Sequence, residues 1–175
     1  MKKLFSIILI LAAVVITSCE GPMGVPGEDG DTIIGSVFEI EGDFKASNEY
    51  KLYFEFPQNF EIFETDVVLV YILWDVVQTN GGTLDVWRLL PQTVVLPEGI
   101  IQYNFDYTVN DVQIFMEGTI PPRDWLPAET NNQVFRIAVL PADFLAKKSI
   151  DISDFNSLKS LPGLKLDTVG KVEIK

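Results

Sequence analysis

Reactive side chains are scarce in this 175-residue chain, which contains one cysteine and no histidine. A serine hydrolase needs a base beside its nucleophile, and that base is most often histidine. Lys147, Lys148 and Ser149 would permit a serine–lysine arrangement, but a solvated loop explains them more simply. Zinc sites depend on histidine and cysteine ligands, so the composition also argues against zinc. We therefore expect a protein that is not an enzyme and has no cofactor.

Carboxylates are the abundant reactive group, with 25 aspartate and glutamate residues in the chain. A glycoside hydrolase needs two of them about 5–10 Å apart, one with a raised pKa. Glu61, Glu64 and Asp66 cluster before an apolar segment and could supply such a pair. Loop carboxylates rarely meet the pKa requirement. An acidic-site hydrolase is therefore the least favoured of three functional hypotheses.

Calcium is the inorganic ligand that suits carboxylate and carbonyl oxygens. Two stretches offer such oxygens, and neither has the twelve-residue spacing of an EF-hand loop. They are Glu28, Asp29 and Asp31 near the N-terminus, and Asp106, Asn110 and Asp111 around a predicted turn. We expect no bound metal ion, and a calcium site at one of these two stretches is the alternative.

Aromatic side chains are the other group that could bind a ligand, because the rings offer large, rigid contact surfaces. Trp74 and Trp87 lie in apolar, strand-like segments, and we expect both in the core. Trp125 lies among prolines in the loop 121–132, and we expect this tryptophan to be exposed. Loops carry binding residues more often than strands do. This loop, with Trp125, is therefore the predicted binding surface for a glycan or a protein.

The N-terminal residues have the three parts of a secretory signal peptide. Two lysines are followed by the apolar segment 4–16 and then by the small residues Thr17 and Ser18. The segment is too short to span a membrane, which takes about 20 apolar residues. We therefore expect residues 1–18 to be a signal peptide that is removed on export.

Cys19 follows directly, in the stretch Ile16-Thr17-Ser18-Cys19. This stretch resembles the lipobox of bacterial lipoproteins, in which the cysteine is lipidated and becomes the first residue of the mature protein. The resemblance implies two or three acyl chains, such as palmitate, on Cys19 and attachment to the outer membrane. Two chains suffice for stable anchoring, whereas one chain binds only marginally. The membrane face, periplasmic or external, is left open.

The mature chain is strongly acidic. Removing Lys2 and Lys3 takes the 13 basic residues to 11 against 25 acidic ones, a formal charge of −14. Such a surface repels phosphate backbones, so we expect no nucleic-acid partner. It also has no polybasic patch for anionic lipids, so membrane attachment is expected through the lipid on Cys19 alone. A glycan or an envelope protein is the partner to expect, and the oligomeric state is left open.

Glycine occupies every third position after Cys19, from Gly21 to Gly30, with proline or acidic residues between. This composition is collagen-like. Four triplets are too few for a stable triple helix without help, because ordering each chain costs entropy. We interpret residues 19–32 as a tether, about 46 Å long when fully extended. Trimerisation through the triplets is the alternative.

Apolar and polar residues alternate from residue 33 onward, as they do in half-buried strands. The alternation is clearest in residues 101–107. Residues 67–74 form a continuous apolar run, which is typical of a central strand covered on both faces. Further strands are predicted at 37–41, 52–56, 83–90 (which resumes at 93–96 after Pro91), 112–117 and 134–140, and residues 164–174 could form a last strand.

One short C-terminal helix is predicted, with Ser153 as its N-cap and Phe155, Leu158 and Leu161 on one face. Seven or eight strands with a single helix indicate an all-β fold, most simply an antiparallel β-sandwich. A barrel is the alternative, because strand periodicity does not report closure. Residues 33–175 are expected to form one β-sandwich domain.

Cys19-Glu20-Gly21-Pro22, with the Gly-x-y triplets behind it, resembles the start of a family of uncharacterised collagen-like lipoproteins of bacteroidete bacteria. The stretches 85–92, 110–115 and 132–136 are similar to further blocks of that family, so the resemblance spans the mature chain. It implies an envelope lipoprotein and no particular activity. The favoured function is a non-catalytic structural or binding module. A carbohydrate- or protein-binding accessory subunit is the alternative.

Overall fold

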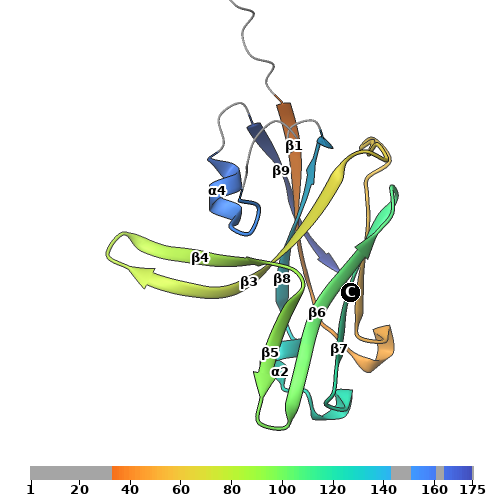
Figure 1. The fold of residues 1–175 in the computed structure, drawn as a ribbon, viewed down its shortest axis with the longest axis vertical. Coiled ribbons are helices and arrows are strands. Elements are labelled where there is room, and N and C mark those ends of the chain that lie inside the picture. Colours follow the sequence, from red (N-terminus) through yellow and green to blue (C-terminus); the bar gives the residue numbers. More distant parts are fainter. Residues whose placement is uncertain (1–32, 143–150, 161–163, 175) are drawn as a thin grey trace, which may run out of the picture. The chain divides into compact units, whose positions relative to one another are not determined.

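Two β-sheets face each other in the computed structural model, which describes residues 33–142, 151–160 and 164–174 (Figure 1). The larger sheet has the strand order β4-β3-β8-β1-β9, and the smaller one has the order β2-β7-β6-β5. Cys19, the predicted tether and Leu161 lie outside the described residues.

The strands and helices have the following bounds. The larger sheet consists of β1 (Ile33–Gly42), β3 (Val67–Thr79), β4 (Gly82–Leu89), β8 (Gln133–Leu140) and β9 (Leu164–Ile174). The smaller sheet consists of β2 (Lys51–Glu55), β5 (Gln92–Leu96), β6 (Gly99–Tyr107) and β7 (Asp111–Gly118). The short helices are η1 (Ala46–Asn48), η2 (Pro122–Asp124), α2 (Pro127–Thr130) and α4 (Phe155–Lys159).

The predicted all-β sandwich is confirmed, and neither sheet closes into a barrel in the described residues. The strands are not all antiparallel, however, because β9 runs parallel to β1 from Ile33↔Leu164 to Gly42↔Ile174. β1 lies between β8 and β9 and is antiparallel to β8. β9 begins at the end of the sheet where β8 ends, so it must run in the same direction as β1.

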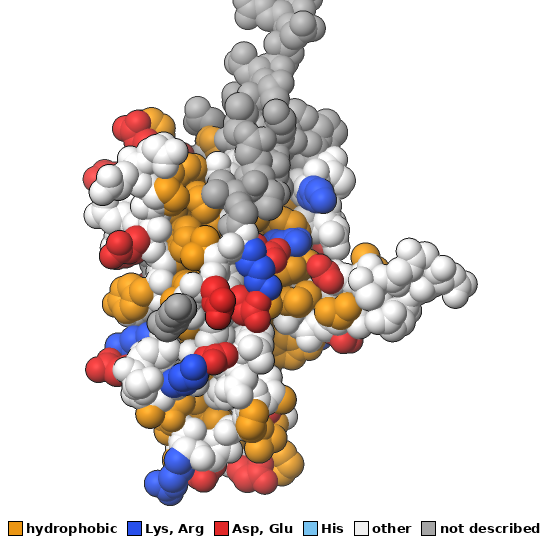
Figure 2. Space-filling model, turned by 180° about the vertical axis from the view of Figure 1, so that it is seen from behind, with side chains coloured by type: hydrophobic (Ala, Val, Ile, Leu, Met, Phe, Trp, Pro, Cys, Tyr) orange, Lys and Arg blue, Asp and Glu red, His pale blue; other side chains and the backbone are white. Residues whose placement is uncertain are grey.

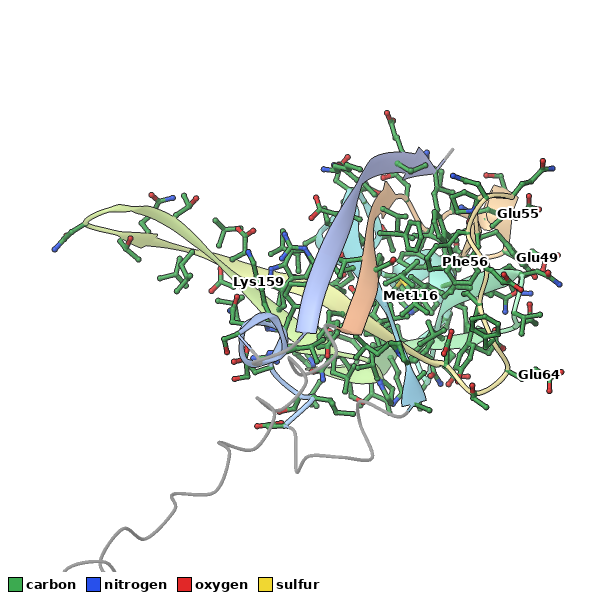
Figure 3. The ribbon with its side chains drawn as sticks, turned by 90° about the horizontal axis from the view of Figure 1, so that it is seen from above. Glu49, Glu55, Phe56, Glu64, Met116 and Lys159 are labelled. Carbon is green, nitrogen blue, oxygen red and sulfur yellow. The ribbon has the colours of Figure 1, made fainter. Side chains whose placement is uncertain are left out.

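The alternating residues of the two sheets meet in an inter-sheet core. Phe38 of β1 lies at its centre and is almost fully buried. Its ring contacts those of Phe54, Phe56 and Phe60, with centroids 5.1, 5.7 and 4.9 Å away. Met116 of β7 also lies inside the sandwich (Figure 3). Burial of these side chains on one face of each sheet explains the period-two pattern of the sequence.

A second apolar cluster covers the outer face of the larger sheet, where α4 packs. Tyr71 of β3 and Trp87 of β4 contact Phe155 of α4, with ring centroids 5.2 and 6.1 Å apart. The Tyr71 hydroxyl donates a hydrogen bond to the carbonyl of Ile152 (2.7 Å), and burial raises the Tyr71 pKa. Because β3 is covered on both faces here, the apolar run of the sequence is explained. Phe155 and Leu158, which were predicted to share one face of the helix, are both buried.

The N-cap of α4 is Asp154, and the prediction of Ser153 is wrong. The Asp154 carboxylate accepts hydrogen bonds from the main-chain N–H groups of Asn156 and Ser157, both at 3.1 Å. Ser153 instead donates from its hydroxyl to Asp151 (2.6 Å). Hydrogen bonds from Ser157 and Asn156 hold the pKa of Asp154 below its usual value, because they favour the charged form.

Replacing Asp154 with alanine should lower the free energy of unfolding by about 1 kcal/mol at neutral pH, because two N–H groups lose their acceptor. Asn at position 154 keeps an acceptor and is the matched control, with a smaller expected loss. The folded-state pKa is lowered, so the stabilisation is present above the unfolded pKa of about 4 and is lost as the pH falls through the folded value. Urea unfolding at pH 7 and pH 3 measures both effects; an alanine variant equally destabilised at both would contradict them.

Candidate functional site

Trp125 is buried, and the prediction of an exposed tryptophan is wrong. Its side chain is 9 % exposed and belongs to the inter-sheet core. The indole Nε1 donates to the carbonyl of Ile120 (3.0 Å), and the ring packs edge-on against Tyr50 with centroids 4.8 Å apart. The physical reason is that η2 and α2 turn this proline-rich loop back onto the sandwich. Trp125 therefore offers no face for stacking on a sugar.

The other two tryptophans lie on β3 and β4. Trp87 is buried, as predicted, and the Arg136 guanidinium lies 3.9 Å from its ring centroid. Trp74 is only half buried, although the sequence placed it in a core run. Its ring carries the guanidinium of Arg88 at 4.1 Å from the centroid. Among the tryptophans, Trp74 is thus the one that borders the surface.

The carboxylates singled out in the sequence form no shared site. Glu61 and Glu64 are exposed, and Glu64 points into solvent from the loop before β3 (Figure 3). Asp66 accepts a hydrogen bond from the main-chain N–H of Phe63 (3.0 Å) and so closes that loop. Lys147, Lys148 and Ser149 lie outside the described residues. This loop thus has the structure of a solvated turn.

The proposed calcium ligands at the β6–β7 turn are occupied in hydrogen bonds. Asp111 accepts from the hydroxyl of Thr108 (2.7 Å), and Asp106 accepts weakly from Gln113 (3.5 Å). No three acidic, histidine or cysteine side chains gather to hold a metal ion in the described ranges. Glu28, Asp29 and Asp31 lie outside those ranges. We do not propose a calcium site at the turn.

The most distinctive surface feature is a two-stranded arm formed by the distal halves of β3 and β4. We define it as residues 74–86, joined by a turn at Asn80 and Gly81. Figure 1 shows the arm leaving the sandwich on the side of β3 and β4, away from β6 and β7. Figure 2 shows that its tip carries no charged side chains. β3 was predicted to end at residue 74, so the arm lengthens it by five residues.

The arm exposes apolar side chains on one face of β3 and β4, the same face that packs in the inter-sheet core where these strands belong to the sandwich. Val77 pairs directly with Leu84, so both project from one face, and they are 42 % and 54 % exposed. Leu84 shares this face of β4 with Arg88, which pairs with the core residue Ile72. The inter-sheet face of β3 and β4 therefore continues beyond the smaller sheet. On the opposite face of the arm, Val76 is 43 % exposed.

A pocket of about 270 Å³ lies at the base of the arm. Its walls come from both sheets, with Trp74 of β3 facing Val94 of β5 and Tyr103 of β6. The Tyr103 hydroxyl donates to the carbonyl of Glu129 in α2 (2.7 Å), and burial raises the Tyr103 pKa, so this group stays neutral. The pocket thus has both apolar and polar lining residues, and Glu129 and Gln133 are among the polar ones. The Glu129 carboxylate accepts a hydrogen bond from the main-chain N–H of Leu126 (2.7 Å).

A second pocket, of about 480 Å³, lies beside the β5–β6 turn. The loop that the sequence indicated for binding contributes Pro121, Asp124 and Leu126 to its wall. That loop thus borders a hollow even though Trp125 points away from the solvent. Its role in ligand binding remains a prediction.

Sequence reasoning missed Val76, Val77 and Leu84 as surface residues. Valine and leucine are typical of buried strands, so the residue types alone do not indicate that these side chains are exposed. One signal in the sequence indicates their exposure. Residues 78–83 are all polar or glycine, and this composition is typical of a turn in solvent that joins two strands.

Comparison of this chain with protein families, characterised proteins and solved structures finds no significant match. None of the helices in the described part of the chain is both long and apolar enough to cross a membrane.

Proposed function

We propose that this protein is an envelope lipoprotein, anchored to the outer membrane by lipid on Cys19, whose β-sandwich is a non-catalytic binding module for another polypeptide. The N-terminal pattern supports the anchor: a signal peptide, small residues before a lone cysteine, and a glycine-rich tether behind it. An acidic domain without a polybasic patch needs such an anchor to stay at a membrane.

The exposed arm is the observation that carries the binding role. Soluble domains rarely leave large apolar side chains together on a projecting element, because burying them is favourable. Val77 and Leu84 together with Val76 expose apolar surface on both faces of a strand pair that has no cover in the described residues. Such a surface is typical of a protein interaction site. The burial of Trp125 removes the stacking surface on which a carbohydrate site had been predicted.

Site-specific photocrosslinking in intact cells tests the binding role. We expect the full-length protein with a photoreactive benzoylphenylalanine at position 77 to form a covalent adduct with another polypeptide. The same group at position 53, a more exposed site on the smaller sheet, is the control and should form no such adduct. Equal labelling from both positions, or none from position 77, would contradict the proposal.

A further inference from the structure

β3 has an open edge along the arm. β8 pairs with β3 from Val67 to Ile72 and then stops, whereas β4 continues alongside as far as Thr79. Beyond Ile72, β3 therefore has β4 on one side and no second strand on the other among the described residues. Every second residue of such an edge directs its main-chain N–H and C=O outward.

The open-edge residues are Val76 and Gln78. The N–H of Val76 donates to the carboxylate of Asp75 at 2.8 Å, so it points away from the ladder with β4. An added strand would have to take the place of this carboxylate. The register continues without a shift from Val76↔Asp85 to Gln78↔Thr83. In an antiparallel pair, hydrogen-bonded and non-hydrogen-bonded residue pairs alternate. Gln78 and Thr83 form a non-hydrogen-bonded pair by this rule, so the N–H of each points to the outer side of its own strand.

This edge has neither lysine nor proline to oppose strand pairing, and a bulge between Leu73 and Asp75 lies at its base. Folded proteins commonly block such edges with lysine or proline. The smaller sheet follows this rule, because β5 is only five residues long and lies between Pro91 and Pro97. The stretch Leu73–Thr79 contains neither lysine nor proline.

The geometry at the base of the arm also suits an added strand. β8 begins at Gln133, which lines the 270 Å³ pocket together with Trp74. A strand placed on the open edge would lie in line with β8, and its end would reach this pocket. Its apolar side chains could then contact Trp74 and Val77, which the sandwich leaves partly uncovered.

Charge decides which kind of polypeptide fits. The arm carries Asp75 and Asp85 but no lysine, and Glu129 lines the pocket. Arg88, at the base of the arm, is stacked on Trp74. The whole chain has a formal charge of −12. These charges attract a basic segment and oppose pairing with a second copy of this chain.

We infer that the open edge of β3, from Leu73 to Thr79, binds an extended, basic segment of a partner polypeptide, which adds a strand in line with β8. Main-chain hydrogen bonds would supply affinity, and alternate apolar side chains on the arm face would supply specificity. The inference rests on the proposed function, since it names how the arm recognises its partner.

Two proline variants at facing positions test the edge. Gln78→Pro removes an N–H from the open edge of β3, and Thr83→Pro removes one from the outer edge of β4. Neither N–H belongs to the ladder between the two strands, so the hairpin should persist in both variants. Circular dichroism of the full-length, detergent-solubilised proteins checks this point.

The probe is the fluorescently labelled heptapeptide Val-Lys-Val-Lys-Val-Lys-Val, with its Val-Glu counterpart as a charge control. We expect saturable binding to the wild type, binding at least tenfold weaker to Gln78→Pro, and binding within twofold of wild type for Thr83→Pro. N-methylation of alternate peptide residues should also weaken binding at least tenfold. No saturable binding of the Val-Lys peptide, equal effects of the two prolines, or preference for the Val-Glu peptide would overturn the inference.

The photocrosslink from position 77, repeated in both proline variants, separates the two proposals. Loss of the adduct in Gln78→Pro alone supports edge pairing. An adduct that persists in Gln78→Pro means that the partner binds the face of the arm, so the function stands and the inference fails. An adduct with a second copy of this chain overturns the inference, and the absence of any adduct contradicts the proposed function itself.

Discussion

Replacing Trp125 with alanine should lower the free energy of unfolding by about 3–5 kcal/mol, the usual cost of deleting a buried tryptophan side chain. The ring packs in the inter-sheet core against Tyr50, and its N–H satisfies the carbonyl of Ile120. The variant therefore loses apolar burial and leaves a polar atom without its donor. Urea unfolding of the purified protein, followed by circular dichroism, measures the loss.

Trp125→Phe is the matched control for this substitution. It keeps an aromatic ring beside Tyr50 and removes the indole N–H, so we expect a smaller loss of about 1–2 kcal/mol. An alanine variant with wild-type stability would contradict the buried position. It would then favour the surface role that the sequence suggested for this residue.

Replacing Cys19 with alanine should move the protein from the membrane fraction to the soluble fraction. The proposed acyl chains would be attached through the thiol of Cys19, and each buried methylene contributes about 0.8 kcal/mol to membrane binding. With 11 basic against 25 acidic residues, we expect no electrostatic attachment of the mature chain to anionic lipids. Cell fractionation followed by immunoblotting measures the shift, and the circular dichroism of the released protein should match that of the wild type.

Ser18→Ala is the control for the Cys19 substitution, because it keeps a small residue before the cysteine and leaves the thiol in place. This variant should remain with the membranes. Retention of the Cys19→Ala protein in the membrane fraction would show that another part of the chain anchors it. Release of both variants would point to a defect in export instead.

The strand pattern and the core could be predicted from the sequence because both follow from local side-chain periodicity. Phe38 in the inter-sheet core and Phe155 under α4 occupy the positions that their patterns indicate. The helix cap was displaced by one residue, because Ser153 and Asp154 are both good caps and the geometry of the preceding turn chooses between them. The parallel pairing of β9 depends on which strand lies beside it, and periodicity carries no information about neighbours.

The candidate site could not be predicted, for two separate reasons. Val77 and Leu84 have the residue types of a buried strand, and their exposure depends on where the opposite sheet ends. Trp125 lies in a loop that contains Pro121, Pro122 and Pro127, yet two short helical turns bring its ring back to Tyr50. In both cases the deciding contact is between residues far apart in the chain. Cys19, in contrast, is indicated by four adjacent residues.

Mass spectrometry of the N-terminal fragment of the protein, isolated from membranes, tests the central claim of a lipid-anchored domain most directly. We predict a fragment that begins at Cys19 and carries a glyceride and acyl chains on that residue. A fragment that begins elsewhere, or an unmodified Cys19, would contradict the claim.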